Sequence, residues 1–240
     1  MIPKEPNTLR LMTFNVHGCI GRGGKYDQGL VMQVIEESDA DFVALQEVYD
    51  EDPEDRRFLS SLENSSYSEM VYGITLTHEM RGPYGNVFLS RWPLSEVKRL
   101  NISIEPYEPR GAIRVKAKLG QRCIDLTATH LGLRKKERAM QLSKLIDEWK
   151  LGERESSEDE IFCFMGDLNE WLPGGGILRQ LSRQFGRSPF IRTFPSGRPA
   201  FALDRIFVRP RQLALRWFAA RTQAARRASD HLPLLADLKL

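Results

Sequence analysis

The chain has 240 residues, of which 41% are hydrophobic, 28% charged and 9% aromatic, and its formal net charge at pH 7 is +3. This composition excludes a disordered or low-complexity chain and predicts a globular protein with a packed core. No apolar run reaches the roughly 18 residues of a membrane-spanning helix, and the N-terminal segment lacks the apolar stretch of a signal peptide. We therefore expect one cytoplasmic domain over residues 1–240, without a transmembrane segment and monomeric.

The first hundred residues are predicted to mix strands with helices. Hydrophobic periodicity indicates a strand at Leu9–Val16, a helix at about Asp27–Ser38 and a buried strand that begins at Phe42 and ends at Glu47. A glycine-rich loop over residues 18–24 separates the first strand from the helix. The next expected elements are a short helix at Asp55–Leu62 in an acidic stretch, and strands at Met70–Leu76, Asn86–Ser90 and Leu94–Leu100.

A β-hairpin is predicted over residues 113–130. Apolar and basic residues alternate over 113–119, which is typical of an antiparallel strand with one face toward water, and Gly120-Gln121 supplies the turn. The returning strand places His130 in phase with Leu126 and Ala128. The histidine is therefore expected to point among apolar neighbours.

The second half of the chain continues with a similar mixture. The expected elements are an amphipathic helix at Arg134–Lys150, a polar loop at Gly152–Asp159, a central strand at Ile161–Met165, a helix at Ile177–Phe185, and strands at Asp204–Val208, Leu213–Ala219 and Leu232–Leu240. Many strands with few helices favour two packed sheets flanked by helices.

Polar side chains that can do chemistry recur where the predicted strands begin or end. They are Asn15, Glu47, His130, Asp167 with Asn169, Asp204, and Asp230 with His231. If these ends meet at one rim, they form a pocket rich in oxygen ligands and imidazoles, which suits Mg²⁺ and a phosphoester substrate. Glu47 is the best candidate for a metal ligand. Asp204 could orient His231 as a general base.

Motifs of several other chemistries are absent. The chain has no G-x-x-x-x-G-K-[ST] phosphate loop and no H-E-x-x-H, G-x-S-x-G or C-x-x-C motif. The glycine triplet at 174–176 is a weak phosphate-binding signal and is left unassigned. Cys19, Cys123 and Cys163 are widely spaced, so we expect buried thiols instead of a zinc site or a disulfide framework.

Six short motifs give the chain a family resemblance. They are Thr13-Phe14-Asn15-Val16, Leu45-Gln46-Glu47, Thr129-His130-Leu131, Gly166-Asp167-Leu168-Asn169, Leu203-Asp204-Arg205-Ile206 and Ser229-Asp230-His231. In this order they resemble the endonuclease/exonuclease/phosphatase superfamily, whose fold is that of deoxyribonuclease I and exonuclease III. Segments 85–91, 108–111, 130–138 and 192–195 resemble its bacterial hydrolase branch.

The resemblance implies a fold and a metal site. The fold would be a four-layered α-β-β-α sandwich, an α/β architecture of two mostly antiparallel mixed sheets flanked by helices. Mg²⁺ or Mn²⁺ would bind Glu47, with Asn15 and Asp230 beside the metal. His17 occupies a position that is acidic in some nucleases of this fold, so the resemblance does not extend to a second metal-side carboxylate.

The resemblance also implies roles for the remaining residues. Asp167 would orient or deprotonate the attacking water, and Asn169 would bind the phosphate or the nucleophile. His231, paired with Asp204, would act as a base or a hydrogen-bond donor, which leaves the choice of base between Asp167 and His231 open. His130 would be a second proton donor, and Arg110 would contact phosphate.

The substrate class rests on charge. Residues 36–69 contain twelve acidic and two basic residues, whereas residues 171–230 contain twelve arginines and two acidic residues. Arginines suit phosphate contacts, so we expect Mg²⁺-dependent hydrolysis of a phosphodiester in DNA or RNA. Trp171 could stack on a base or pack internally. Alternatives are a phospholipid or sphingolipid phosphodiesterase, for which Trp217-Phe218 is a weak candidate lip, a small-metabolite phosphatase, or an inactive binding module.

Overall fold

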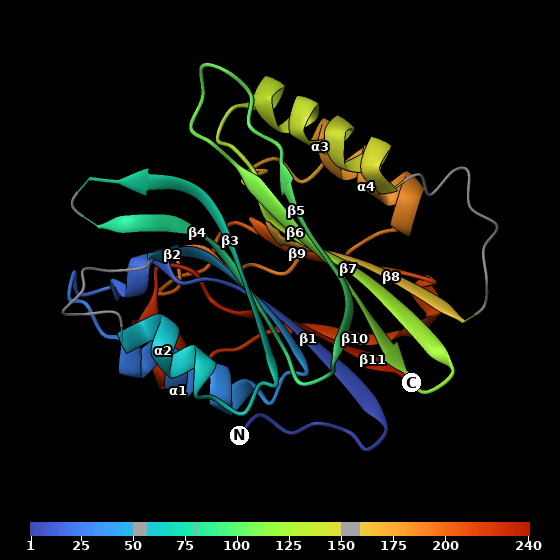
Figure 1. Cartoon of the computed structure of the whole chain (residues 1–240), viewed down its shortest axis with the longest axis horizontal. Helices are drawn as coiled ribbons and strands as arrows, with labels where there is room; N and C mark the ends of the chain where they lie inside the picture. Colours follow the sequence, from blue (N-terminus) through green and yellow to red (C-terminus); the bar gives the residue numbers. More distant parts are fainter. Residues whose placement is uncertain (50–56, 80, 150–158) are drawn as a thin grey trace.

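Two β-sheets lie face to face, with helices on both outer faces (Figure 1). The structure is a computed structural model that describes residues 1–49, 57–79, 81–149 and 159–240. The first sheet has the strand order β10-β11-β1-β2-β4-β3, and the second has the order β5-β6-β7-β8-β9. This is the α-β-β-α sandwich that the sequence predicts.

The strands have the following bounds. In the first sheet they are β1 Thr8–Asn15, β2 Phe42–Tyr49, β3 Glu69–His78, β4 Gly82–Ser90, β10 Ala214–Ala219 and β11 Leu234–Lys239. In the second sheet they are β5 Leu94–Asn101, β6 Gly111–Leu119, β7 Arg122–His130, β8 Glu160–Asp167 and β9 Asp204–Arg209. β1 and β2 pair in parallel, as do β7 and β8, and the remaining pairs are antiparallel.

Helices cover each sheet on the side away from the other sheet. The first sheet packs against α1 Gln28–Ser38, α2 Arg57–Glu63 and α5 Gln223–Ala228, and the second against α3 Lys135–Trp149 and α4 Gly176–Phe185. Two short 3-10 helices lie at His17–Cys19 and Arg211–Leu213. α1 begins after Asp27, whose carboxylate accepts a hydrogen bond from the backbone N–H of Leu30. None of the described helices is long and apolar enough to cross a bilayer.

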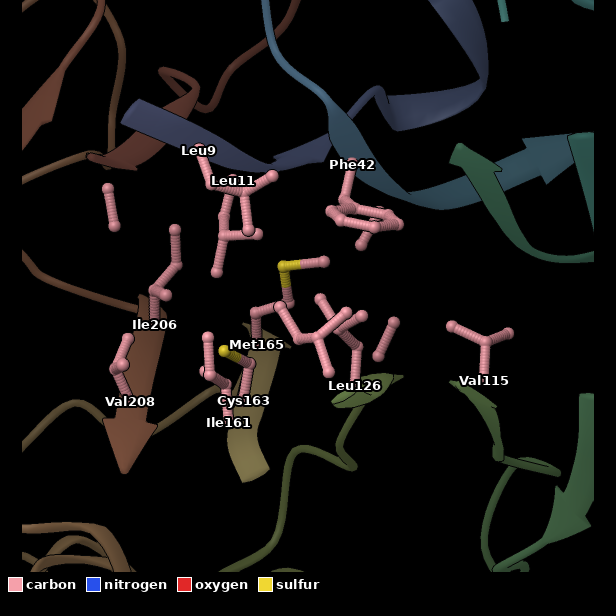
Figure 2. Close-up of a cluster of buried hydrophobic side chains, with 14 of the residues drawn as sticks. Leu9, Leu11, Phe42, Val115, Leu126, Ile161, Cys163, Met165, Ile206 and Val208 are labelled. Atoms are coloured by element: carbon pink, nitrogen blue, oxygen red, sulfur yellow. The ribbon is translucent and has the colours of Figure 1, made fainter. Parts of the chain in front are cut away.

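The main apolar core lies between the two sheets. In Figure 2, Leu9 and Leu11 of β1 point toward Met165 of β8 and Ile206 of β9, and Phe42 of β2 joins them. All five side chains are buried. Because alternate residues of a strand face the same side, one apolar row per strand fills this layer and sets how the two sheets stack.

Some predicted elements differ from the structure. Helix α5 is not in the sequence prediction, because its six residues carry too short a pattern. β2 continues past Glu47 to Tyr49, and the chain before β10 forms a 3-10 turn at Arg211–Leu213. The start of the predicted helix at 55–62 and most of the predicted loop at 152–159 lie outside the described residues.

The outer face of β6 is less exposed than its alternating sequence predicts. Arg114 is buried, and its guanidinium pairs with Asp125 of β7 at 2.6 Å. It also donates to the backbone carbonyl of Glu148 in α3 at 2.9 Å. Helix α3 therefore covers this face, and an arginine–carboxylate pair replaces the expected contact with water.

Cys19, Cys123 and Cys163 form no disulfide in the described part of the chain. Cys19 and Cys163 are buried as predicted, whereas Cys123 is half-buried. Burial raises the pKa of both Cys123 and Cys163 above the ordinary thiol value, so these two side chains are protonated at neutral pH.

Candidate active site

Three neighbouring strands bring polar residues together at one edge of the second sheet. His130 ends β7 and lies opposite Asp167, which ends β8, and Asp167 in turn lies opposite Asp204, which begins β9. The register of the strands thus places an imidazole and two carboxylates side by side. Gly166 permits this approach, because a Cβ at that position would lie 1.9 Å from the carbonyl oxygen of Thr129.

The first sheet contributes Asn15 and Glu47 to the same place. Asn15 ends β1, and Glu47 lies in a β-bulge of β2 with a backbone φ of +58°. A bulge turns a side chain away from the regular alternation of a strand. Sequence periodicity predicts that the strand ends at Glu47. In the structure the strand continues, and the bulge directs the Glu47 carboxylate toward the residues of the second sheet.

Asp167 lies at the centre of these contacts. The amide nitrogen of Asn15 donates to Glu47 Oε1 at 2.8 Å and to Asp167 Oδ2 at 3.1 Å. The same Asp167 oxygen lies 3.6 Å from His130 Nε2 and 3.7 Å from His231 Nε2. Side chains from both sheets therefore converge on one carboxylate oxygen.

His231 and Asp204 form a hydrogen-bonded pair. His231 Nδ1 lies 2.9 Å from Asp204 Oδ2, which also accepts a hydrogen bond from the hydroxyl of Thr193. Ser229 ties the His231 segment to β1, because its hydroxyl donates to the carbonyl of Asn15 and accepts from the backbone N–H of His231. The predicted pairing of Asp204 with His231 is thus present, and Thr193 and Ser229 support it.

His130 faces Asn169 and Arg110. The Asn169 amide nitrogen donates to the carbonyl of Leu131 at 2.9 Å and lies 3.0 Å from His130 Nε2. The role of His130 as a second proton donor, which the resemblance implies, stays a prediction. Arg110 Nη1 lies 3.5 Å from the other ring nitrogen, and Arg110 also pairs with Glu108 at 2.7 Å.

These residues line an open cavity of about 350 Å³. The lining includes Asn15, Glu47, Arg110, His130, Asp167, Asn169 and His231. Trp171, Phe194 and Leu133 form part of the wall, and Phe194 lies 4.9 Å from the His231 ring between ring centroids. The cavity thus unites seven of the nine residues that the sequence predicts for the site.

One wall of the cavity is missing from the sequence prediction. Tyr49, His78 and Tyr84 form an aromatic group with ring centroids 4.7 to 5.7 Å apart. His78 is not among the site residues that the sequence predicts, because no neighbour in the chain suggests a partner for it. The pairing of β2, β3 and β4 brings the three rings together, and Tyr49 lies only two residues after Glu47.

Two residues that the sequence predicts for the site, Asp204 and Asp230, do not line the cavity. Asp204 is fully buried behind His231. Asp230 is absent from the lining, and its Oδ1 lies 3.8 Å from His17 Nδ1. Asn15 Oδ1 accepts from the backbone N–H of His17, so Asn15 presents its nitrogen to the carboxylates. Metal contacts of Asp230 and Asn15 stay predictions.

The two imidazoles differ in their protonation. Burial opposes a charge on His231, but the nearby carboxylates of Asp204 and Asp167 outweigh it and raise the pKa of His231 to about 10. Burial lowers the pKa of His130 to about 3, and the positive charge of Arg110 adds to this effect. At neutral pH the cavity therefore presents one imidazolium and one neutral imidazole.

The donor set of the cavity fits a divalent cation. Burial raises the pKa of the Glu47 carboxyl, the hydrogen bond from Asn15 offsets part of this rise, and the charge of Asp167 adds to it. Two carboxylates that share one amide nitrogen would be relieved by a cation, and hard oxygen ligands suit Mg²⁺ or Mn²⁺. Asp167, Asp204 and His231 also have ligand atoms within 4.8 Å of one another, but Asp204 and His231 already bind each other.

A family model for the "Endonuclease/Exonuclease/phosphatase family" matches residues 12–231. The chain belongs to this family. The match runs from β1 to His231 and so includes every residue that the sequence predicts for the site. The resemblance inferred from the six motifs is confirmed, and with it the expectation of a hydrolase fold.

Proteins of similar sequence or structure align over nearly the whole chain. The "Uncharacterized protein YbhP" of Escherichia coli K12 is 28% identical over 259 aligned positions, which cover 97% of both chains. An endonuclease/exonuclease/phosphatase from Beutenbergia cavernae superposes with a TM-score of 0.75 at 22% identity over 98% of this chain and 72% of that one. Truncated Caenorhabditis elegans TDP2 gives 0.69 at 17% identity over 97% and 98%. The two solved structures share the fold of this chain.

The protonation of the two histidines is directly measurable in this family member. In metal-free protein at pH 7, ¹⁵N NMR of the imidazole rings is expected to show His231 with both nitrogens protonated and His130 neutral, because the carboxylates beside His231 hold its proton and burial excludes one from His130. Asp204→Asn should return the His231 pKa toward neutrality. A neutral His231 at pH 7 in the unsubstituted protein would contradict this electrostatic picture.

Proposed function

We propose that the protein is a divalent-metal-dependent phosphodiesterase that acts on nucleic acid. The observation that carries this proposal is the convergence of Asn15, His130 and His231 on a single oxygen of Asp167. A phosphate in this cavity meets a positive His231 and a neutral His130, with Arg110 at the wall. This arrangement supports hydrolysis, because positive charge and hydrogen-bond donors stabilise the charge that grows on phosphate oxygens.

Each step has a group suited to it. When bound at Glu47, Mg²⁺ would neutralise phosphate charge and lower the pKa of water. Asp167 orients the attacking water and accepts its proton as the water oxygen bonds to phosphorus. The bond to the leaving oxygen breaks, and the leaving oxygen takes a proton from solvent. His231 is already protonated at neutral pH, which favours Asp167 as the base, so Nε2 of His231 donates to a phosphate oxygen.

Nucleic acid is the substrate class that the charge distribution favours. Residues 171–230 contain twelve arginines and two acidic residues. Such an excess of positive charge attracts the phosphate backbone of nucleic acid. Trp171 lies in the cavity wall with 41% of its surface exposed, although its ring also packs edge-on against Phe201 at 4.9 Å. Its exposed part can stack on a base.

Removal of the metal tests the proposal directly. Purified protein with Mg²⁺ is expected to cleave plasmid DNA or single-stranded RNA, and EDTA is expected to abolish this cleavage. Glu47→Gln should raise the Mg²⁺ concentration for half-maximal activity by about 100-fold or more, since loss of a second-shell partner alone costs up to about that much. Glu63→Gln, an exposed position in α2, is the matched control. Equal cleavage in EDTA and Mg²⁺ would contradict metal dependence.

A lipid phosphodiester is a second candidate substrate because the cavity has an exposed apolar rim. Leu133 in the lining is 64% exposed, and Leu172 next to Trp171 is 66% exposed. Trp217 is not part of this rim, because its indole N–H donates to the carbonyl of Ile206 and the Arg211 guanidinium carbon lies 4.0 Å from its ring centroid. Assays with plasmid and with phospholipid vesicles separate the two. Cleaved lipid beside untouched plasmid would replace nucleic acid as the substrate.

A further inference from the structure

A second cavity, here called the arginine cavity, lies between α4 and β9. Its volume is about 470 Å³. Its lining includes Arg179, Arg183, Arg187, Arg205, Ser188 and Phe190. Arg179, Arg183 and Arg187 are four residues apart. This spacing places Arg179 and Arg183 on one side of α4, which ends at Phe185, and Arg187 follows two residues after that end. No acidic residue appears in the lining among the described residues.

Arg205 gives this cavity a buried cation without a counter-ion. It is 3% exposed, its Nη1 donates to the carbonyl of Pro189 at 2.8 Å, and its Nε has no hydrogen-bond partner. No carboxylate in the described part of the chain forms an ion pair with it, although Asp204 and Glu170 act on it from a greater distance. Its guanidinium carbon lies 5.1 Å from the centroid of the Phe190 ring. Burial lowers the pKa of Arg205 to about 10, because no carboxylate at contact distance offsets the loss of water.

The remaining groups of the cavity suit a phosphate attached to a flat apolar group. The Ser188 hydroxyl is buried without a hydrogen-bond partner, as is Arg205 Nε. Leu178 and Phe207 form an apolar wall, and Phe190 is 43% exposed. Guanidinium groups bind phosphate oxygens in pairs of hydrogen bonds, and an exposed aromatic ring can stack on a base.

The arginine cavity is separated from the active-site cavity by one short loop. Trp171 lines the active-site cavity, whereas Pro173 and Gly174 line the arginine cavity. We propose that the arginine cavity is a second phosphate site, outside the reaction centre, that holds a flanking phosphate of a nucleic-acid strand bound across residues 171–174. This inference rests on the proposed substrate class and explains part of the arginine excess of the C-terminal third.

Binding without turnover tests this assignment. A fluorescein-labelled single-stranded oligothymidylate is titrated into metal-free protein in EDTA, and its fluorescence anisotropy gives the affinity. Replacing the exposed pair Arg183→Gln and Arg187→Gln should weaken binding about tenfold or more and reduce the slope of log affinity against log salt by about 0.7 per lost phosphate contact. The charge-matched control is Lys118→Gln with Arg221→Gln, two exposed residues in neither cavity.

A second variant and a second ligand complete the test. Arg205→Lys retains the charge but loses the planar fork, and it should weaken oligonucleotide binding while circular dichroism stays unchanged. Inorganic phosphate is titrated in parallel by calorimetry. If the Arg183/Arg187 variant binds oligonucleotide as tightly as the control variant, the assignment is overturned, even if phosphate binding is lost, because the cavity would then take a free anion. Since no hydrolysis is measured, this failure is distinguishable from a failure of the proposed function.

Discussion

Asp167→Asn is expected to lower kcat for phosphodiester hydrolysis by about 10³-fold or more, within the range of general base and electrostatic contributions together. The substitution keeps the shape of the side chain and its hydrogen bond from the backbone N–H of Asn169, 2.9 Å from Oδ1. It removes the negative charge that faces His130 and His231. The measurement is single-turnover hydrolysis of a chromogenic phosphodiester in saturating Mg²⁺.

Two comparisons make this result specific to the site. His231→Ala should produce a loss of similar size, about 10²- to 10⁴-fold, because it removes the imidazolium that Asp204 holds against the phosphate. Asp147→Asn makes the same chemical change at an exposed position of α3 and should leave kcat within about twofold of the unsubstituted enzyme. Turnover by Asp167→Asn within about tenfold of the unsubstituted enzyme would remove Asp167 from the role of base.

Asp237→Ala is expected to lower the free energy of unfolding by about 3–5 kcal/mol, because it leaves a buried cation without its partner. The Arg10 side chain is fully buried, and its guanidinium forms two hydrogen bonds to Asp237, at 2.6 and 3.0 Å. Its other donors bind the carbonyls of Ile2, Pro3 and Ser38. Arg10 therefore joins β1 to β11, to the N-terminal residues and to the end of α1. The lost stability is measured by urea unfolding, with the slope m as a check.

The pH dependence of this effect has a defined direction. Burial opposes the charged form of Asp237, but hydrogen bonds from Arg10 and Arg216 outweigh it and lower its pKa below the ordinary 3.8. A lowered folded-state pKa contributes stability above the unfolded pKa, and that stability is lost as the pH falls through the folded value. The difference between Asp237→Ala and the unsubstituted protein should narrow below about pH 4. Glu96→Ala removes the partly exposed ion pair with Lys116 and should lower the free energy of unfolding by at most about 1 kcal/mol. An equal loss of stability for Asp237→Ala and Glu96→Ala would contradict the argument.

Local patterns predicted most of the strands, and also helices α3 and α4, which pack against the second sheet. The alternation over 113–119, the turn after it and the apolar run at 161–165 correspond to β6, the β6–β7 turn and β8. The alternation predicts β6 because the two faces of that strand meet different surroundings, and the apolar run predicts β8 because that strand is buried on both faces. Short helix α5 and the covered position of Arg114 were missed, because only contacts with distant segments decide them.

The sequence by itself determined the family, through six short motifs, and the fold class, through the periodicity of its strands and helices. It also supplied the candidate site residues, because polar residues at the ends of apolar strands are visible in a single chain. Only the tertiary structure decided which of them face one oxygen of Asp167, which imidazole holds a proton, and that His78 and two tyrosines complete the wall. It also gathered four arginines into a second cavity. The physical reason is the separation along the chain of the residues that interact. Periodicity depends on residues close together in the sequence, whereas pairing register, bulges and desolvation depend on distant segments that folding brings together.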